Sequence, residues 1–284
     1  MPPPTDSPPV SGTHQHLELA VVGLGNMGGA VLRGLLEAKV LTPDQVGVCD
    51  LLPDRIRTFT DIGCREIDPT EVGEAPRMLL AVKPQMFPSV ARQIGDRAGR
   101  RLAISVMAGL PSRQIVEALG DATAVIRTMP NTPASIGCGV TAISLGPGAT
   151  PDDLAFVQRI FESVGRVVPV EESDFHAVTA VSGSGPAWLF RMAEAWTAAA
   201  ISEGLPPATA RTLVNETLLG ASTLLQNSER GASALREAVT SKGGTTAAGL
   251  EALDRSGFDD AIHDAIRAAV VRGRELGQDD QTDQ

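Results

Sequence analysis

The chain has 284 residues, which at roughly 150 residues per domain suffices for two domains with a sizeable buried core. Its formal net charge of -10, without a lysine-rich or arginine-rich run, argues against nucleic acid as a partner. The sequence contains no tyrosine, which excludes every mechanism in which a tyrosine hydroxyl protonates the substrate.

The composition of the chain ends and the spacing of the cysteines indicate the cellular compartment. Residues 1–16 are rich in proline, serine and threonine without a basic region followed by an apolar core, so we interpret them as a disordered tail. Residues 278–284 form a second polar tail, and no apolar run reaches the about 18 residues of a membrane span. The three cysteines are too widely spaced for a disulfide framework or a zinc cluster. We expect a cytoplasmic protein with no membrane association and no metal site.

Two domains are predicted from the change in pattern near residue 172. Before it, short apolar runs alternate with amphipathic stretches, as is typical of a parallel sheet with crossover helices on both faces. The runs are LELAVVGLG, QVGVCD, RMLLAVK, RLAISVMAG, ATAVIRTMPN, GVTAISLG and RVVPV. After it, the segments favour helix by composition and by apolar residues at three- and four-residue spacing. We predict an α/β domain over residues 17–172 and an all-α domain over residues 173–277.

The helical domain is also expected to join subunits. Its first two helices carry apolar residues around much of their circumference, which usually means burial on several sides. A domain of about 110 residues offers too few internal partners for that, so we expect at least a homodimer through this domain.

The motif GLGNMG follows the first apolar run and opens a helix. Its position is that of a dinucleotide-binding fingerprint, with one glycine for a tight turn, one for close approach of the pyrophosphate and one for helix packing. The free N-H groups at the helix start then face the phosphates. This motif predicts a Rossmann-type domain that binds NADH or NADPH, and its candidate contacts are Gly23, Gly25, Asn26, Met27 and Gly28.

Asp50 ends the second apolar run, close to the expected distance of about 20 residues beyond the glycines. A carboxylate there accepts hydrogen bonds from ribose hydroxyls and repels a 2'-phosphate, which favours NADH. A solvated turn is the alternative, and Arg55 and Arg57 just beyond could serve a 2'-phosphate, so the cofactor preference stays open.

Other candidates lie where later strands end, because ligands of parallel sheets sit beyond the carboxyl ends of the strands. Lys83 could meet the cofactor or attract an acidic substrate, and Asn131 is equally compatible with turn chemistry. The candidate cofactor contacts at these ends are Ala81, Val82, Lys83, Pro84, Met107, Ala108 and Gly109.

The segment Ser241–Thr246 lies between two predicted helices. Its glycines free the backbone, and N-H groups at the start of the second helix can hold a carboxylate. A plain helix C-cap is the alternative from this segment alone.

Five motifs, GLGNMG, AVKPQ, MPNTPA, VSGSGPA and SKGGTTAAGLEALD, occur in this order along the chain. Their order and spacing resemble the pyrroline-5-carboxylate reductase family from about Leu17 to Leu276. The resemblance implies reduction of the cyclic imino acid 1-pyrroline-5-carboxylate to L-proline by NAD(P)H, in dimers that often form larger rings.

The resemblance also implies roles for the residues of the last motif. It places Ser241 and the backbone of Gly243, Gly244 and Thr245 near the substrate carboxylate, and Thr246 near the ring nitrogen as the candidate catalytic residue. It places Asp68 near the adenosine, where the family often has asparagine.

Two other functions remain as alternatives. A β-hydroxyacid dehydrogenase would place a catalytic lysine on the first helix after the domain junction, and residues 187–203 contain none. A non-catalytic dinucleotide-binding regulator would keep GLGNMG but would not need the Ser241–Thr246 segment.

Overall fold

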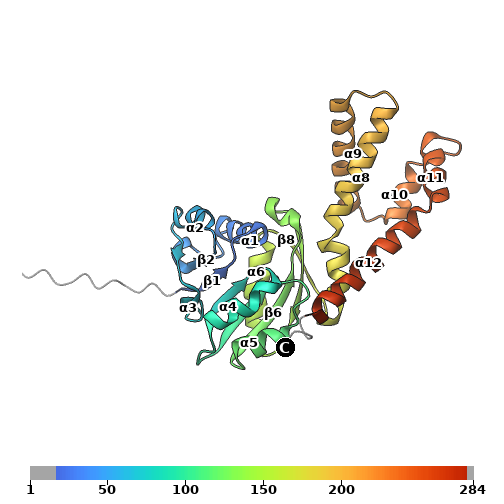
Figure 1. The fold of residues 1–284 in the computed structure, drawn as a ribbon. Coiled ribbons are helices and arrows are strands. Elements are labelled where there is room, and N and C mark those ends of the chain that lie inside the picture. The colour runs from blue at the N-terminus through green and yellow to red at the C-terminus, as the bar shows by residue number, and fades with distance from the viewer. Residues whose placement is uncertain (1–16, 280–284) are drawn as a thin grey trace, which may run out of the picture. The chain divides into compact units, whose positions relative to one another are not determined.

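The computed structural model describes residues 17–279, so the predicted tail at residues 1–16 and most of the one at residues 278–284 lie outside the described residues. The chain divides into two compact units between Phe175 and His176, and Figure 1 shows both. The predicted domain boundary lies three residues earlier, after residue 172.

The first unit contains an eight-stranded sheet with the order β3-β2-β1-β4-β5-β6-β7-β8. Since β1 has β2 on one side and β4 on the other, the strand order reverses at the carboxyl end of β1, where open α/β sheets bind ligands. The strands are β1 (Leu19–Val22), β2 (Val46–Cys49), β3 (Arg65–Glu66), β4 (Arg77–Leu80), β5 (Arg101–Ser105), β6 (Thr123–Met129), β7 (Gly139–Leu145) and β8 (Gly165–Pro169).

Helices cover both faces of this sheet because alternate strand residues point to opposite sides. One core contains Leu19 and Val21 of β1 with apolar residues of α1, α2 and α6; the other contains Ala20 and Val22 with residues of α3, α4 and α5. The Rossmann-type prediction is therefore confirmed. The helices are α1 (Asn26–Glu37), α2 (Pro53–Thr60), α3 (Pro69–Val72), α4 (Phe87–Ile94), α5 (Ser112–Leu119) and α6 (Pro151–Glu162).

The sheet is not parallel throughout, which corrects the prediction. β7 runs antiparallel to β6, while β8 is parallel to β7. The connection from β6 to β7 is residues 130–138, which contain only a 3-10 helix, Thr132–Ile136. A parallel connection needs a crossover of about a dozen residues or more, so the chain turns back instead.

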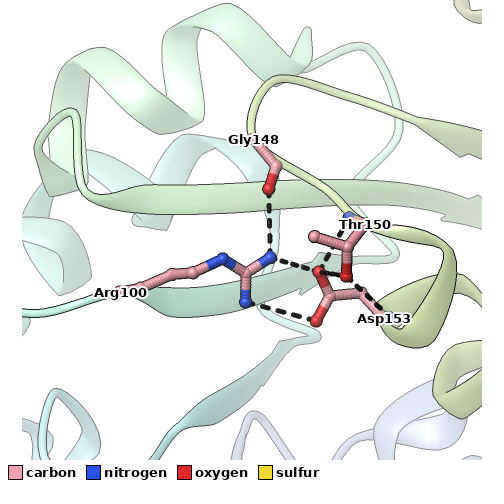
Figure 2. Close-up of polar contacts among 4 residues, drawn as sticks. All are labelled: Arg100, Gly148, Thr150 and Asp153. Carbon is pink, nitrogen blue, oxygen red and sulfur yellow. Dashed lines mark hydrogen bonds and ion pairs between the residues drawn. The ribbon is translucent and has the colours of Figure 1, made fainter.

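The start of α6 is fixed to the segment before β5 by an ion pair, shown in Figure 2. Arg100 pairs with the Asp153 carboxylate and donates to the carbonyl of Gly148 at 3.0 Å. The Thr150 hydroxyl donates to Asp153 Oδ2 at 2.7 Å, and the Asp153 N-H donates to Thr150 Oγ1 at 3.2 Å. Burial alone would raise the pKa of Asp153, but the hydrogen bonds from Arg100 and Thr150 hold that pKa below its ordinary value. The helix start therefore has both a cap and a charged anchor.

Glu172 explains why the first unit extends beyond residue 172. Its carboxylate accepts from the N-H and the hydroxyl of Ser112 at 2.7 and 2.6 Å, and from Arg127 Nη1 at 3.1 Å. The Arg127 side chain is 7% exposed, and its guanidinium lies 4.3 Å from the ring centroid of Phe175. Residues 172–175 are thereby held on the first unit, a long-range contact that local sequence patterns do not reveal.

Replacing this carboxylate is expected to destabilise the chain. Burial alone would raise the pKa of Glu172, but hydrogen bonds from Ser112 and Arg127 lower it below its ordinary value. Glu172→Gln should reduce the free energy of unfolding by about 2–3 kcal/mol at neutral pH, because it leaves the Arg127 charge buried without its counter-ion. A carboxylate with a lowered pKa stabilises above its unfolded-state pKa and loses this contribution as the pH falls. The difference in stability between Glu172→Gln and the native protein should therefore be smaller at about pH 3, below the ordinary glutamate pKa of about 4.3, than at neutral pH. Urea denaturation at both pH values measures it.

Glu171→Gln provides the matched control, because this substitution removes the same charge from an exposed side chain one residue earlier. Equal losses of stability in the two variants at neutral pH would contradict the role given to Glu172.

The second unit is helical, as predicted. Its helices are α7 (Phe175–Val178), which begins at the last residue of the first unit, α8 (Gly185–Ser202), α9 (Pro207–Asn227), α10 (Ala232–Ala238), α11 (Thr245–Arg255) and α12 (Phe258–Asp279). A π-helical turn, Thr179–Gly183, precedes α8 and packs against α12. α8 and α9 lie side by side in Figure 1 and contact each other. Within residues 17–279, no helix has the length and apolarity that crossing a membrane requires.

Candidate functional site

The glycine-rich loop joins β1 to α1. Gly23 has a φ of +94°, and a Cβ there would lie 2.6 Å from the Ala81 carbonyl oxygen. A Cβ on Gly28 would lie 2.0 Å from the Gly23 oxygen and 2.9 Å from the Ala81 Cβ. A Cβ on Gly25 would meet nothing closer than Arg55 Nη1 at 3.8 Å. Gly23 and Gly28 are thus required by local packing, whereas the space at Gly25 opens toward a ligand.

This loop borders a cavity of about 1160 Å³ at the carboxyl ends of β1, β2, β4 and β5. Two predicted cofactor contacts, Gly28 and Gly109, do not line it: Gly28 packs α1 against the loop, and Gly109 lies in a turn with a φ of +78°. The predicted residues that do line it are Gly23, Gly25, Asn26, Met27, Asp50, Asp68, Ala81, Val82, Lys83, Pro84, Met107 and Ala108.

The carboxylate of Asp50 holds the glycine-rich loop in place. The Leu24 N-H donates to Oδ2 at 2.6 Å, and the Leu52 N-H donates to Oδ1 at 2.9 Å. Arg55 Nη1 lies 3.6 Å from Oδ2, and the Asp50 side chain is only 6% exposed. A carboxylate has about four lone-pair positions, so Asp50 retains acceptor capacity for ribose hydroxyls while it fixes the loop.

Of the three other residues that the sequence suggested, namely Arg55, Arg57 and Asn131, only Arg55 lines the cavity. Arg55 lines the cavity, whereas Arg57 pairs with Asp54 at 3.3 Å on the exposed side of α2. Asn131 accepts a hydrogen bond from the Val140 N-H at 2.9 Å and does not line the cavity, which favours its role in the turn.

Sequence reasoning missed four polar side chains that line the cavity, namely Glu66, Glu71, Ser89 and Gln93. Glu66 ends a two-residue strand that is too short for a periodic signal. Ser89 and Gln93 lie one turn apart on α4, where the i, i+4 spacing was the available signal. Pro84 and Pro88 stand where proline is usual, at the start of a 3-10 helix and in the first turn of α4, but α4 has only eight residues and so gives a weak periodic signal.

The predicted substrate-binding segment lies in the second unit, at the start of α11. Gly243 has a φ of +74°, and the Gly244 N-H donates to the Ser241 carbonyl at 3.0 Å to close a turn. Gly244 is the N-cap and has no side chain to accept the first N-H groups of α11, which begins at Thr245. Thr246 is exposed in the first turn. The segment therefore presents donor N-H groups beside the two threonine side chains.

Two protein-family models match different parts of the chain. Residues 18–109 match the family described as NADP oxidoreductase, coenzyme F420-dependent. Residues 172–276 match the family described as pyrroline-5-carboxylate reductase dimerisation, which indicates that the chain self-associates.

Relatives that align with more than nine-tenths of the chain agree with these matches. Pyrroline-5-carboxylate reductases of Synechocystis and Thermus thermophilus are each 38% identical, over 92% of this chain and 99% of theirs. The structure of a pyrroline-5-carboxylate reductase from Coxiella burnetii superposes with a TM-score of 0.84 at 31% identity, over 92% of this chain and 98% of that one. A Plasmodium falciparum pyrroline carboxylate reductase with NADP bound gives 0.80 at 25% identity, over 93% and 99%. The chain belongs to the pyrroline-5-carboxylate reductase family.

Proposed function

We propose that this protein reduces 1-pyrroline-5-carboxylate to L-proline with NADH or NADPH, the last step of proline biosynthesis. The observation that carries the proposal is the cavity at the glycine-rich loop in a chain of which 92% aligns with a member of this family. The Ser241–Thr246 segment supports a catalytic protein over a regulator that only binds the cofactor. The absence of lysine from α8 argues against a β-hydroxyacid dehydrogenase.

The residues of the cavity fit a dinucleotide. Gly25 leaves space for a pyrophosphate beside the N-H groups that begin α1, and Asp50 offers acceptors to a ribose. When bound there, the reduced nicotinamide supplies a hydride. Lys83, Met107 and Ala108 at the ends of β4 and β5 would then border its reactive half.

The second unit provides the substrate contacts in this proposal. The backbone N-H groups of residues 243–245 and the Ser241 hydroxyl would hold the substrate carboxylate. The Thr246 hydroxyl would donate a hydrogen bond to the lone pair of the imine nitrogen, which makes the adjacent carbon more electrophilic. As the hydride forms the new C-H bond, the nitrogen would take a proton from water, relayed through this hydroxyl. Little further help is needed once the reactants are positioned and water is excluded.

The direct test is the loss of absorbance at the reduced nicotinamide band with 1-pyrroline-5-carboxylate, run in parallel with NADH and NADPH. Turnover with either cofactor supports the reductase. Cofactor binding without turnover favours the regulator, and oxidation of a small hydroxy acid instead would favour the dehydrogenase.

The homodimer is proposed to form through the helical domain, residues 173–277. Among the described residues, α8 has none that is buried and α9 has only Ala210 and Val214. Large apolar side chains face outward along both helices, including Phe190 at 59% and Leu219 at 64% exposure. Surfaces of this kind mark interaction sites. Assembly of dimers into larger rings is part of the same proposal.

Leu219→Glu is expected to shift the protein toward the monomer, because it places a charge in the apolar contact. Light scattering after size exclusion should give at least twice the chain mass for the native sequence and a lower mass for the variant. Ile62→Glu, at a 52% exposed residue of the first unit, should leave the mass unchanged. A monomeric native protein would contradict the dimer.

We also propose a cytoplasmic location. Three unpaired cysteines, Cys49, Cys64 and Cys138, support it, because free thiols persist in reducing compartments. Cell fractionation tests it.

A further inference from the structure

The cofactor cavity is strongly acidic on the side of β2 and β3. Four carboxylates line it there: Asp50 after β2, Glu66 at the end of β3, and Asp68 and Glu71 at α3. The strand order β3-β2-β1 places these ends beside the glycine-rich loop. A dinucleotide whose pyrophosphate rests on that loop has its adenosine ribose near the acid that follows β2. The acidic side is therefore the adenosine side.

Two of these four charges are compensated and two are not. Asp50 pairs with Arg55, and Glu71 pairs with Arg65. Within residues 17–279, neither Glu66 nor Asp68 has an ion-pair partner. A 2'-phosphate, which carries a charge of about -1.5 to -2 near neutral pH, would enter next to both.

On the acidic side of the cavity, Arg55 is the lining residue with a positive charge, and it already pairs with Asp50. Its partner Asp50 is 6% exposed, so moving Arg55 onto a 2'-phosphate would leave a nearly buried carboxylate without its counter-ion. Binding of NADPH would thus form an Arg55–phosphate contact only by breaking the Asp50–Arg55 pair. The ribose hydroxyls of NADH can bind Asp50 while the Asp50–Arg55 pair stays intact.

The thiol of Cys49, at the wall of the cavity, responds to the same charges. Burial first, and then the negative charges of Asp50, Asp68 and Glu66, raise its pKa to about 11. The potential of these three carboxylates thus reaches the cavity wall.

We infer that this protein discriminates against NADPH and prefers NADH, and that Glu66 and Asp68 determine this specificity together with the Asp50–Arg55 pair. The inference rests on the proposed function only in requiring that the cavity bind the dinucleotide.

Binding titrations of the full chain with NADH and with NADPH, followed by nicotinamide fluorescence at low salt, test it. We expect NADH to bind at least about tenfold more tightly. Glu66→Gln and Asp68→Asn should each tighten NADPH binding about two- to fivefold and leave NADH within about twofold. Asparagine keeps the N-cap of α3, so the second variant preserves the fold. Higher ionic strength should reduce the ratio of the NADPH and NADH dissociation constants of the native protein, because salt screens exposed charges.

Glu74→Gln is the matched control, because Glu74 is exposed in the same segment and does not line the cavity. It should leave the ratio of the two dissociation constants unchanged. Equal or tighter binding of NADPH by the native protein, or an unchanged ratio in the Glu66→Gln, Asp68→Asn double variant, would overturn the inference. A preference for NADH without turnover of 1-pyrroline-5-carboxylate would support it while refuting the proposed function. Binding of neither dinucleotide would refute both.

Discussion

Gly28→Ala is expected to weaken dinucleotide binding by more than about 100-fold and to destabilise the first unit by about 2–3 kcal/mol. The added methyl group would lie 2.0 Å from the Gly23 carbonyl oxygen and 2.9 Å from the Ala81 Cβ. Neither the backbone oxygen nor the strand end can move without distorting the loop that faces the cavity. Thermal unfolding and titration with NADH measure the two effects.

Gly25→Ala tests the space for the ligand without disturbing the packing of the glycine-rich loop. Its new methyl group would meet no atom closer than 3.8 Å, so the fold should keep its stability. The same group would project toward the pyrophosphate and should still weaken binding. If Gly28→Ala bound NADH as tightly as the native protein, the packing role given to Gly28 would be wrong.

Thr246→Ala is expected to lower the turnover of 1-pyrroline-5-carboxylate by about 100-fold, because it removes the donor proposed for the ring nitrogen. Binding of NADH should persist, since Thr246 belongs to the second unit and the lining residues of the cavity all belong to the first. Steady-state rates with saturating cofactor, together with a NADH titration, distinguish these effects.

Thr246→Ser keeps the hydroxyl and should retain most of the activity. Thr245→Ala keeps the main-chain N-H through which residue 245 is proposed to act, so it should lose far less than Thr246→Ala. Full activity in Thr246→Ala would remove this hydroxyl from the mechanism.

The sequence predicts best where one local pattern determines one element. The apolar run before GLGNMG and the amphipathic stretch after it define β1, the loop and α1, because the turn, the ligand space and the packing all need glycine within six residues. The change from strand to helix composition likewise predicts the second unit.

Features that depend on distant residues escape such patterns. The antiparallel direction of β7 follows from a short connection whose 3-10 helix has no periodic signal. The attachment of residues 172–175 to the first unit depends on Ser112 and Arg127, far away in the chain. Glu66 reaches the cavity only because its strand pairs with β2 at the sheet edge.

The hydrogen bond from Leu24 to Asp50 also bears on how this enzyme could evolve. Asp50 supports the loop that any dinucleotide must use, so a mutation there alters cofactor choice and loop integrity together. Glu66 makes no such contact, and asparagine at position 68 retains the cap. A lineage adapting to a different balance of reduced cofactors would therefore pass through positions 66 and 68 first, with position 50 conserved until a second substitution supported the loop.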